Sequence, residues 1–413
     1  MQGFARAFAA ALVLVAGTAW PGLAPADDAT GKGTVRIGLL DPASGPFAGE
    51  GSDVEAGFRY YLATHGDKLG GFVVELRTGD EGTTPDAALA TAHQLVEQDN
   101  ADAIVGVLNS TDAYTLAPYI DEQKKLLVIT GAGADGLTQT QVPKTIFRVS
   151  HTSSQDVMPL GDYVCRRMHL KTAAIVGTDY SYGIESAGGF ARGYTDSGCR
   201  VVQELYASVG ADWAPVVAKI DKRAQVVFAG VGAVDSVAFV SAYRTAGPRI
   251  PLTGDPTLTD ERWLVQERDR ALGITTASHY SAMLKTPINV AFRLGYESLT
   301  GHQVSLFVEN GYVAAQMLAA ALEKQATGPV KLDALLPALR AVQIAGPRGS
   351  VHFDRFQQVV NAVYIRQVRQ VGGRFRNEVI ETYPEVSQFG QYDPQRYLAL
   401  PPYAKLKGTW ARS

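Results

Sequence analysis

Short apolar segments alternate with amphipathic segments along almost the whole chain, and this alternation restricts the possible folds more than any other feature. Continuous apolar runs such as 103–105 are typical of parallel strands that are covered on both faces. The spacing of Val54, Phe58 and Tyr61 instead puts apolar side chains on one face of a helix. Strands that alternate with helices predict parallel sheets built from βαβ units.

The alternation occurs in two successive blocks. In the first block we expect strands at 34–40, 72–78, 103–108 and 126–130, and helices at 50–64, 84–98 and 112–123. In the second block we expect strands at 172–177, 200–206, 225–230 and 250–254, and helices at 155–169, 184–196, 212–222 and 234–246. We then expect helices at 287–300, 307–325 and 332–342 and an antiparallel hairpin of strands 349–353 and 360–369. The fold class is therefore α/β, with two doubly wound parallel-sheet domains.

The order of the elements also predicts how the chain is divided. We expect chain crossings near 146–153, 276–282 and 344–349, which would join the two domains by a three-crossing hinge. The expected parts are an N-terminal lobe of residues 33–148 and 283–343, a C-terminal lobe of residues 152–277 and 346–382, and an extended surface tail of residues 383–413.

Residues 1–26 have the pattern of a secretory signal peptide. Arg6 is the only charge in this segment, the apolar run from Ala7 to Trp20 is too short to span a bilayer, and Ala24 and Ala26 are small residues at the cleavage position. The sequence thus predicts cleavage after Ala26 and a periplasmic location in a Gram-negative envelope.

Charge and motif content exclude several classes of protein. Loss of Arg6 leaves 37 basic and 41 acidic residues, a formal charge of about −4, so no basic excess favours nucleic acid. The chain has no G-x-S-x-G and no H-E-x-x-H motif, and its seven histidines show no paired metal spacing. We expect a non-enzymatic protein without metal or cofactor; a site formed by distant residues, as in an envelope hydrolase, remains the alternative.

Cys165 and Cys199 are the only cysteines. An even pair in an oxidising compartment favours a disulfide. Cys165 lies near the end of the expected helix 155–169 and Cys199 precedes the expected strand 200–206, so both fall at one edge of a βαβ layer. The alternative is two unpaired, half-buried thiols.

Five short motifs occur in a characteristic order. They are Gly45-Pro46-Phe47-Ala48, Asn109-Ser110-Thr111, Tyr182-Gly183, Gly311-Tyr312 and the segment from Gly346 to Asp354. With the order of the elements, they make the chain similar to the periplasmic solute-binding proteins of the leucine/isoleucine/valine-binding family, the type I periplasmic binding proteins. The resemblance covers nearly the whole chain after residue 26. It implies a receptor, expected to be monomeric, that delivers a small carboxylate to an ABC permease; a sensor domain for a signalling partner is the alternative.

Asn109, Ser110 and Thr111 lie between an expected strand and an expected helix. The free N–H groups and the dipole at a helix N-terminus suit a carboxylate, and the resemblance implies a ligand-contacting serine at position 110. The alternative is that Ser110 or Thr111 only caps its helix.

The loop after the next strand contains Gly131, Ala132, Gly133 and Gly136, which spell G-x-G-x-x-G. We reject a dinucleotide site, because Pro143 follows too soon for a full helix and no acidic residue ends the next strand. The backbone of Ala132 and Gly133 is instead expected to approach a small ligand closely.

The chain departs from the branched-chain amino acid receptors at several positions. The resemblance implies that Tyr182 contacts the ligand from the second lobe, but Glu50 replaces a tyrosine of such receptors, and Gly232-Ala233 replaces another. An ammonium ligand needs an acidic partner, since burying it alone costs several kcal/mol. Asp255 falls at or next to that position, with Asp235 as a weaker substitute; a loop-capping role is the alternative for both.

The segment from Val386 to Phe389, with Tyr392-Asp393-Pro394 after it, resembles a subgroup of the family that takes up aromatic carboxylates. Such a ligand needs a carboxylate cradle and apolar walls but no ammonium partner. Phe47, His279 and Tyr280 are the expected walls or ring-hydroxyl partners; for His279 a structural role is the alternative. We place aromatic acids ahead of branched-chain amino acids, and amides and urea stay possible.

Overall fold

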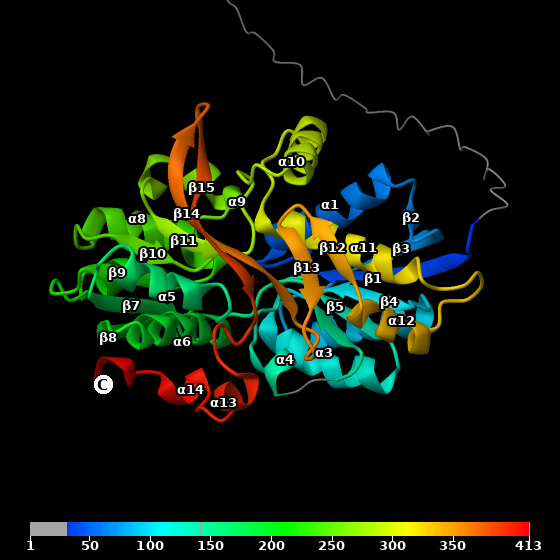
Figure 1. The fold of residues 1–413 in the computed structure, drawn as a ribbon, viewed down its shortest axis with the longest axis horizontal. Helices are drawn as coiled ribbons and strands as arrows, with labels where there is room; N and C mark the ends of the chain where they lie inside the picture. Colours follow the sequence, from blue (N-terminus) through cyan, green and yellow to red (C-terminus); the bar gives the residue numbers. More distant parts are fainter. Residues whose placement is uncertain (1–30, 141–142, 413) are drawn as a thin grey trace, which may run out of the picture. The chain divides into compact units, whose positions relative to one another are not determined.

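The computed structural model describes residues 31–140 and 143–412 (Figure 1). The expected signal segment, residues 1–26, lies outside the described residues. In the described part of the chain, no helix has the length and apolar character needed to cross a bilayer.

The first sheet is parallel except at one edge. Its strand order is β2-β3-β1-β4-β5-β6. The strands are β1 (Thr34–Asp41), β2 (Lys68–Leu69), β3 (Phe72–Asp80), β4 (Ala103–Gly106), β5 (Leu126–Ile129) and β6 (Ile146–Arg148). Only β2 runs antiparallel to its neighbour. All four residues of β4 and of β5 are buried, as the continuous apolar runs predict.

Helices cover both faces of this sheet. They are α1 (Ala48–Thr64), α2 (Pro85–His93), α3 (Ser110–Glu122), α4 (Gly136–Gln139), α11 (Leu306–Leu322) and α12 (Leu332–Arg340). One core packs α1, α11 and α12 against the sheet and a second packs α2 and α3 against the other face. Helices α1 and α11 approach very closely, since a Cβ on Gly57 would lie 1.8 Å from the Val308 carbonyl oxygen. Gly311 mirrors this contact against the oxygen of Val54, at 2.0 Å.

The second sheet combines a parallel part with an antiparallel edge. Its strand order is β12-β13-β14-β11-β10-β9-β7-β8, with β15 beside β14. The strands are β7 (Thr172–Thr178), β8 (Arg200–Ala207), β9 (Val226–Gly230), β10 (Leu252–Gly254), β11 (Thr275–Ser278), β12 (Gln343–Gly346), β13 (Gly349–Phe353), β14 (Val359–Val371) and β15 (Arg374–Val386). The antiparallel pairing of β13 with β14 confirms the expected hairpin.

The helices of this half again lie on two faces. They are α5 (Val157–Arg166), α6 (Ser181–Asp196), α7 (Ala214–Val217), α8 (Ser236–Ala246) and α9 (Glu261–Glu267), and α10 (Pro287–Thr300) follows β11 and one further chain crossing. Helices α5 and α6 share one core with the sheet, and α7, α8 and α9 share the other. The expected fold class, two doubly wound parallel-dominated sheets, is confirmed.

The structure contains strands that were not expected, namely β2, β6, β11, β12 and β15, and it differs from the expected elements in three further places. Helix α7 is shorter than 212–222, because Lys219 and Ile220 make turn-type bonds to residues three positions back. Helix α2 stops at His93, and the rest of the expected helix 84–98 is a π turn at Gln94–Gln98. The last segment, expected to be extended, contains α13 (Pro394–Leu398) and α14 (Tyr403–Leu406).

Three segments connect elements of the two halves: the fully buried 149–156 connects β6 to α5, 279–286 connects β11 to α10, and 354–358 connects β13 to β14. Side-chain amides join the first of these segments to the third and to β14. Gln155 Nε2 donates to the Val359 carbonyl oxygen at 3.0 Å, and Gln358 Nε2 donates to the Ser150 oxygen at 2.7 Å. Strand β13 pairs with β14 in the second sheet, but its Val351 and Phe353 pack in the core of the first sheet.

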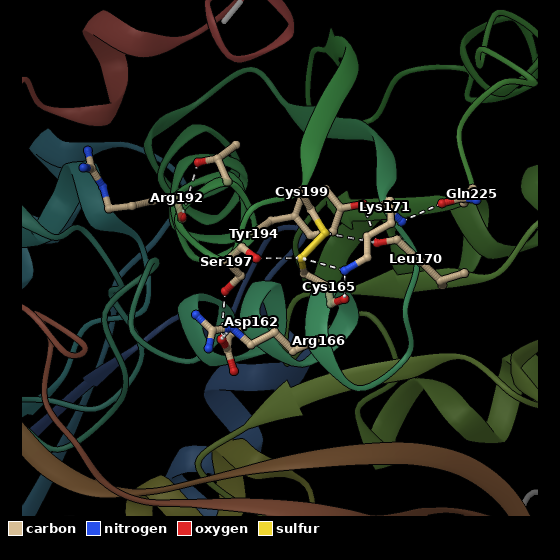
Figure 2. Close-up of a disulfide and its surroundings, with 11 residues drawn as sticks. Asp162, Cys165, Arg166, Leu170, Lys171, Arg192, Tyr194, Ser197, Cys199 and Gln225 are labelled. Atoms are coloured by element: carbon tan, nitrogen blue, oxygen red, sulfur yellow. Dashed lines mark hydrogen bonds and ion pairs between the residues drawn. A yellow bond between two sulfur atoms is a disulfide. The ribbon is translucent and has the colours of Figure 1, made fainter.

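A disulfide joins the end of α5 to the residue before β8. The sulfurs of Cys165 and Cys199 are 1.97 Å apart, and the two cysteines are 34 positions apart in the sequence (Figure 2). Lys171 lies beside the bridge and donates from Nζ to the carbonyl oxygen of Cys165 at 3.0 Å. The bridge thus fixes the helix–strand edge of the second sheet.

Candidate functional site

A cavity lies where loops from the carboxyl ends of strands in both sheets meet, as expected for open parallel sheets. Its volume is about 40 Å³. It is lined by Phe47, Leu108, Asn109, Ser110, Gly131, Gly133, His151, Tyr180, Tyr182, Gly232, Ala233, Thr257 and Phe307. Five of the residues singled out from the sequence are therefore brought together here: Phe47, Asn109, Ser110, Gly133 and Tyr182.

Ser110 opens α3 at the edge of the cavity. Asn109 caps this helix, its Oδ1 accepting from the N–H of Thr111 at 2.8 Å. Ser110 is therefore free of the capping role, and its Oγ accepts from the N–H of Ala134 at 3.1 Å. This contact leaves the hydroxyl hydrogen available for an anion. Thr111 is exposed and lies outside the lining residues.

Most of the main-chain N–H groups around the start of α3 are already used by the protein. The buried carboxylate of Glu81 accepts from the N–H groups of Leu108 and Asn109, each at 2.9 Å. Burial raises the pKa of Glu81 well above its ordinary value, against the effect of these two donors. Sequence analysis missed Glu81, although its place just after strand β3 puts it at the same sheet edge. The N–H groups of Leu108 and Asn109 are therefore not available to a ligand.

The loop after β5 needs glycine beside the cavity. A Cβ on Gly133 would lie 2.9 Å from Ser153 Oγ and 3.1 Å from Tyr182 Cδ2. Within the described residues, the N–H groups of Gly131 and Gly133 donate to no protein acceptor. Ala132 lies behind them, with its N–H bonded to the Val107 oxygen at 2.9 Å. The two glycine amides are thus main-chain donors that are free to bind a ligand.

Two tyrosines form the opposite wall. The rings of Tyr180 and Tyr182 lie 6.2 Å apart and nearly parallel, at 28°. Tyr182 is buried, and its hydroxyl has no hydrogen-bond partner among the described residues. Burial raises the pKa of Tyr182 well above its ordinary value, so the hydroxyl stays neutral and can donate.

Asp255 lies behind this wall rather than among the lining residues. Its Oδ1 accepts from the N–H and the hydroxyl of Thr257, at 2.8 and 2.6 Å, and from the N–H of Leu258 at 3.2 Å. Its Oδ2 accepts from the N–H of Gly232 at 3.2 Å. Asp235 is likewise engaged, by the N–H of Gly210 and by Trp213 Nε1 at 3.2 Å. Both carboxylates organise loops.

Glu50 lies in the first turn of α1, fully buried and outside the lining residues. Neither carboxylate oxygen has a hydrogen-bond partner in the described part of the chain. Burial raises the pKa of Glu50 to about 7, and the nearby charge of Arg262 acts in the opposite direction. Glu50 is therefore partly protonated at neutral pH and offers no fixed negative charge to the cavity.

His279 and Tyr280 lie outside the lining residues. The main-chain N–H and the Nδ1 of His279 both contact Asp156 Oδ2 at 2.9 Å, and its Nε2 contacts Asn310 Oδ1 at 3.0 Å. The Tyr280 hydroxyl donates to Asn289 Oδ1 at 3.0 Å. The His279 side chain joins α5 to α11, the structural alternative that the sequence left open for it, and the Tyr280 side chain holds the start of α10.

His151 is a lining residue that sequence analysis missed. It lies in the first crossing, is 3% exposed, and its ring stacks on that of His279 at 5.0 Å. In residues 31–140 and 143–412, neither of its ring nitrogens finds a hydrogen-bond partner. Burial lowers the pKa of His151 to about 3, so the ring is neutral without a ligand. The sequence feature that could have indicated His151 is its position as a lone histidine among the serines and threonine of 150–154.

Polar contacts join the two halves around the cavity. Arg262 of α9 pairs with Asp53 of α1 at 2.9 Å. The N–H of Leu306, at the start of α11, donates to Asp260 Oδ2 at 2.9 Å. The N–H of Asp135 donates to Glu185 of α6 at 3.1 Å. These contacts link the two halves of the molecule.

The sequence matches the family described as periplasmic binding protein over residues 34–374. The chain belongs to the periplasmic binding protein family. Members of this family are non-enzymatic solute-binding proteins of ABC transporters, which bind small molecules and deliver them to a permease.

Individual relatives carry different ligand assignments. A Leu/Ile/Val-binding protein homologue from Brucella melitensis is 27% identical, covering 84% of this chain and 91% of its own length. A solute-binding protein from Rhodopseudomonas palustris, solved with 3,4-dihydroxybenzoic acid, is 26% identical with a TM-score of 0.81, covering 86% of this chain and 98% of its own. A leucine-, isoleucine-, valine-, threonine- and alanine-binding protein from Brucella ovis shares the fold (20% identity, TM-score 0.78, coverage 87% and 97%).

Proposed function

We propose that this periplasmic binding protein captures an aromatic carboxylate in the cavity and presents it to an ABC permease. The observation that carries the proposal is the state of Asp255. Its two oxygens accept four hydrogen bonds from the loops that they organise, so it offers little to a ligand ammonium group. A branched-chain amino acid would bury that ammonium without a partner, at a cost of several kcal/mol.

The lining supplies what an aromatic acid needs instead. The Ser110 hydroxyl and the N–H groups of Gly131 and Gly133 form a donor set for the carboxylate. Phe47, Tyr180, Tyr182 and Phe307 supply aromatic walls for a ring. The benzoate-type ligand of the similar Rhodopseudomonas protein supports the same class. We further propose that the mature chain begins after Ala26 in the periplasm and acts as a monomer.

Ligand entry requires the lining residues to move apart. The cavity volume is about 40 Å³, whereas a cavity of about 150 Å³ accommodates benzene. The inter-half contacts of Arg262 with Asp53 and of Asp135 with Glu185 must therefore loosen when a ring is admitted. A ligand that contacts both halves then favours closure around itself, because it binds the closed form better than the open form.

The ligand class is tested by thermal unfolding of the purified protein with benzoate, 4-hydroxybenzoate, leucine and the methyl ester of each acid. A ligand at about 100 times its dissociation constant stabilises the folded state by about 2.7 kcal/mol. We expect such a shift with the aromatic acids and none with their esters. A shift with leucine and none with benzoates would refute the aromatic assignment, and equal shifts with acid and ester would refute the carboxylate cradle.

Two neighbouring variants locate the cradle. Ser110→Ala removes the hydroxyl that we propose donates to the ligand carboxylate. We expect this variant to bind 4-hydroxybenzoate at least tenfold more weakly, which corresponds to a loss of about 1.4 kcal/mol in binding free energy. Thr111→Ala is the matched control on the exposed side of the same helix turn and should leave affinity unchanged. Equal affinities for the two variants would place the carboxylate elsewhere.

A further inference from the structure

Three buried polar atoms without partners lie close together at the wall of the cavity. They are the two ring nitrogens of His151 and Oδ1 of Asp156, none of which has a hydrogen-bond partner among the described residues. The side chains of both residues are nine-tenths or more buried. One nitrogen of His151, one carboxylate oxygen of Asp156 and one nitrogen of His279 all lie within 4.8 Å of one another. Unpaired polar atoms at this depth are rare in folded proteins and call for a physical explanation.

A protonated His151 would satisfy all three atoms together. An imidazolium has an N–H on both nitrogens, so it can donate to two acceptors at once, and the free oxygen of the nearby Asp156 is one acceptor that the protein supplies. The second N–H then needs an acceptor from outside the protein. A carboxylate meets this need and also supplies the negative charge that makes the buried imidazolium stable.

Side chains that can carry a positive charge are rare in the lining of the cavity. Among the described residues that line it, His151 is the only one that can become a cation. A buried carboxylate held by neutral donors alone carries a large desolvation cost, which a counter-charge reduces. On the basis of the proposed function, we infer that His151 takes up one proton from solvent when the ligand carboxylate enters, and that the imidazolium then bridges this carboxylate and Asp156.

The charged groups around His151 fit this assignment. The negative charge of Asp156, at the start of α5, raises the pKa of His151. Three positively charged or ionisable neighbours lower it: Arg148 of β6, Arg348 between β12 and β13, and His279 after β11. Tyr182 of α6 faces the ring at 6.2 Å and stays neutral. Asp156 has only one oxygen engaged, by His279, so its other oxygen is available to the imidazolium. Burial keeps the ring neutral until an anion arrives.

A metal ion is a weaker explanation for the same atoms. His151, Asp156 and His279 form a group that could hold an ion. Both ring nitrogens of His279 are already hydrogen-bonded, however, to Asp156 at 2.9 Å and to Asn310 at 3.0 Å. A metal would have to break one of these bonds, whereas a proton breaks none.

The sign of the pH dependence follows from the proton count. The complex holds one proton more than the free protein and free ligand, so binding tightens as pH falls. Above about pH 6 a benzoate is almost fully ionised, as carboxylic acids are. The dissociation constant of 4-hydroxybenzoate should therefore increase about tenfold from pH 6 to 7, and somewhat less than tenfold from pH 5 to 6, where the ligand itself still titrates.

Calorimetric titration of the purified protein with 4-hydroxybenzoate tests the inference. At pH 6, heats in buffers of different ionisation enthalpy should show uptake of one proton by the wild-type protein. His151→Gln should abolish the uptake and flatten the pH profile, whereas His93→Gln, at an exposed histidine of α2, should behave as wild type. A chelator should change nothing; loss of binding in chelator would support the metal instead. The methyl ester of the ligand, which carries no negative charge, should cause no proton uptake.

The outcomes separate this inference from the proposed function. Tight binding with a flat pH profile would overturn the role of His151 and leave the aromatic-acid receptor intact. A pH dependence that persists in His151→Gln would place the proton on the ligand or on another residue, and would also overturn it. Absence of carboxylate binding at every pH would overturn the proposed function, and the inference with it.

Discussion

Replacing Arg348 by Met should reduce the free energy of unfolding by about 3–5 kcal/mol, since it leaves a buried carboxylate without its partner. Arg348 is fully buried, and its Nε donates to Glu309 Oε1 at 2.8 Å while Nη2 contacts Oε2 of the same carboxylate. The guanidinium also donates to the Val149 oxygen at 2.8 Å and to Asn310 Oδ1 at 2.7 Å. It thus joins the first crossing to α11. Equilibrium unfolding in urea measures the change.

Two comparisons make this prediction specific. Arg369→Met breaks an exposed pair with Glu378, with side chains 52% and 33% exposed, and should cost about 0–1 kcal/mol. The double variant Arg348→Met/Glu309→Gln removes both charges and should lose less stability than the sum of the two single variants. If the free energy of unfolding of Arg348→Met lies within about 1 kcal/mol of the wild-type value, the buried pair does not stabilise the junction.

Removal of the disulfide is expected to have an effect of similar size. The bridge closes a segment of 34 positions between Cys165 and Cys199, and the loss of unfolded-state entropy for a loop of this length is worth about 4 kcal/mol. The double variant Cys165→Ala/Cys199→Ala should therefore unfold at a clearly lower urea concentration than the oxidised protein. Neither cysteine lines the cavity, so ligand affinity should change little.

Reduced wild-type protein is the matched control for the double variant. Both lack the bridge, so both should show the same loss of stability relative to the oxidised wild-type protein. If reduction leaves the unfolding curve of the wild type unchanged, the bridge contributes no stability or does not form. A large loss of ligand affinity in the double variant would instead indicate that the α5–β8 edge supports the cavity.

The alternation of apolar and amphipathic segments was sufficient to predict most of the fold. Strands with continuous apolar runs, such as β4 and β5, were placed well because burial on both faces leaves a clear pattern. The short α7 and the break of α2 into a π turn were not predicted, since local bonding rather than periodicity decides where they end. The course of the last residues also depended on tertiary contacts: α13 and α14 pack on α6 through an aromatic cluster around Arg192.

The residues of the candidate site also fall into those that the sequence predicted and those that it did not. Residues in local strand–loop–helix motifs, such as Ser110 and Gly133, were predicted to lie at the cavity, where the structure places them. Residues whose role depends on partners that are distant in the sequence were not predicted. His151 and Glu81 have no motif of their own, and the hydrogen bonds of Asp255 to Gly232 and Thr257 depend on how the loops after β9 and β10 meet. Burial and unpaired atoms, which only the folded chain shows, identify such residues.

A crystal structure of the protein grown with 4-hydroxybenzoate tests the central claim most directly. The account predicts the ligand between the two halves, with its carboxylate within hydrogen-bonding distance of Ser110 Oγ and its ring against Tyr182. A ligand found with its carboxylate away from Ser110, or bound outside the cavity, would contradict it.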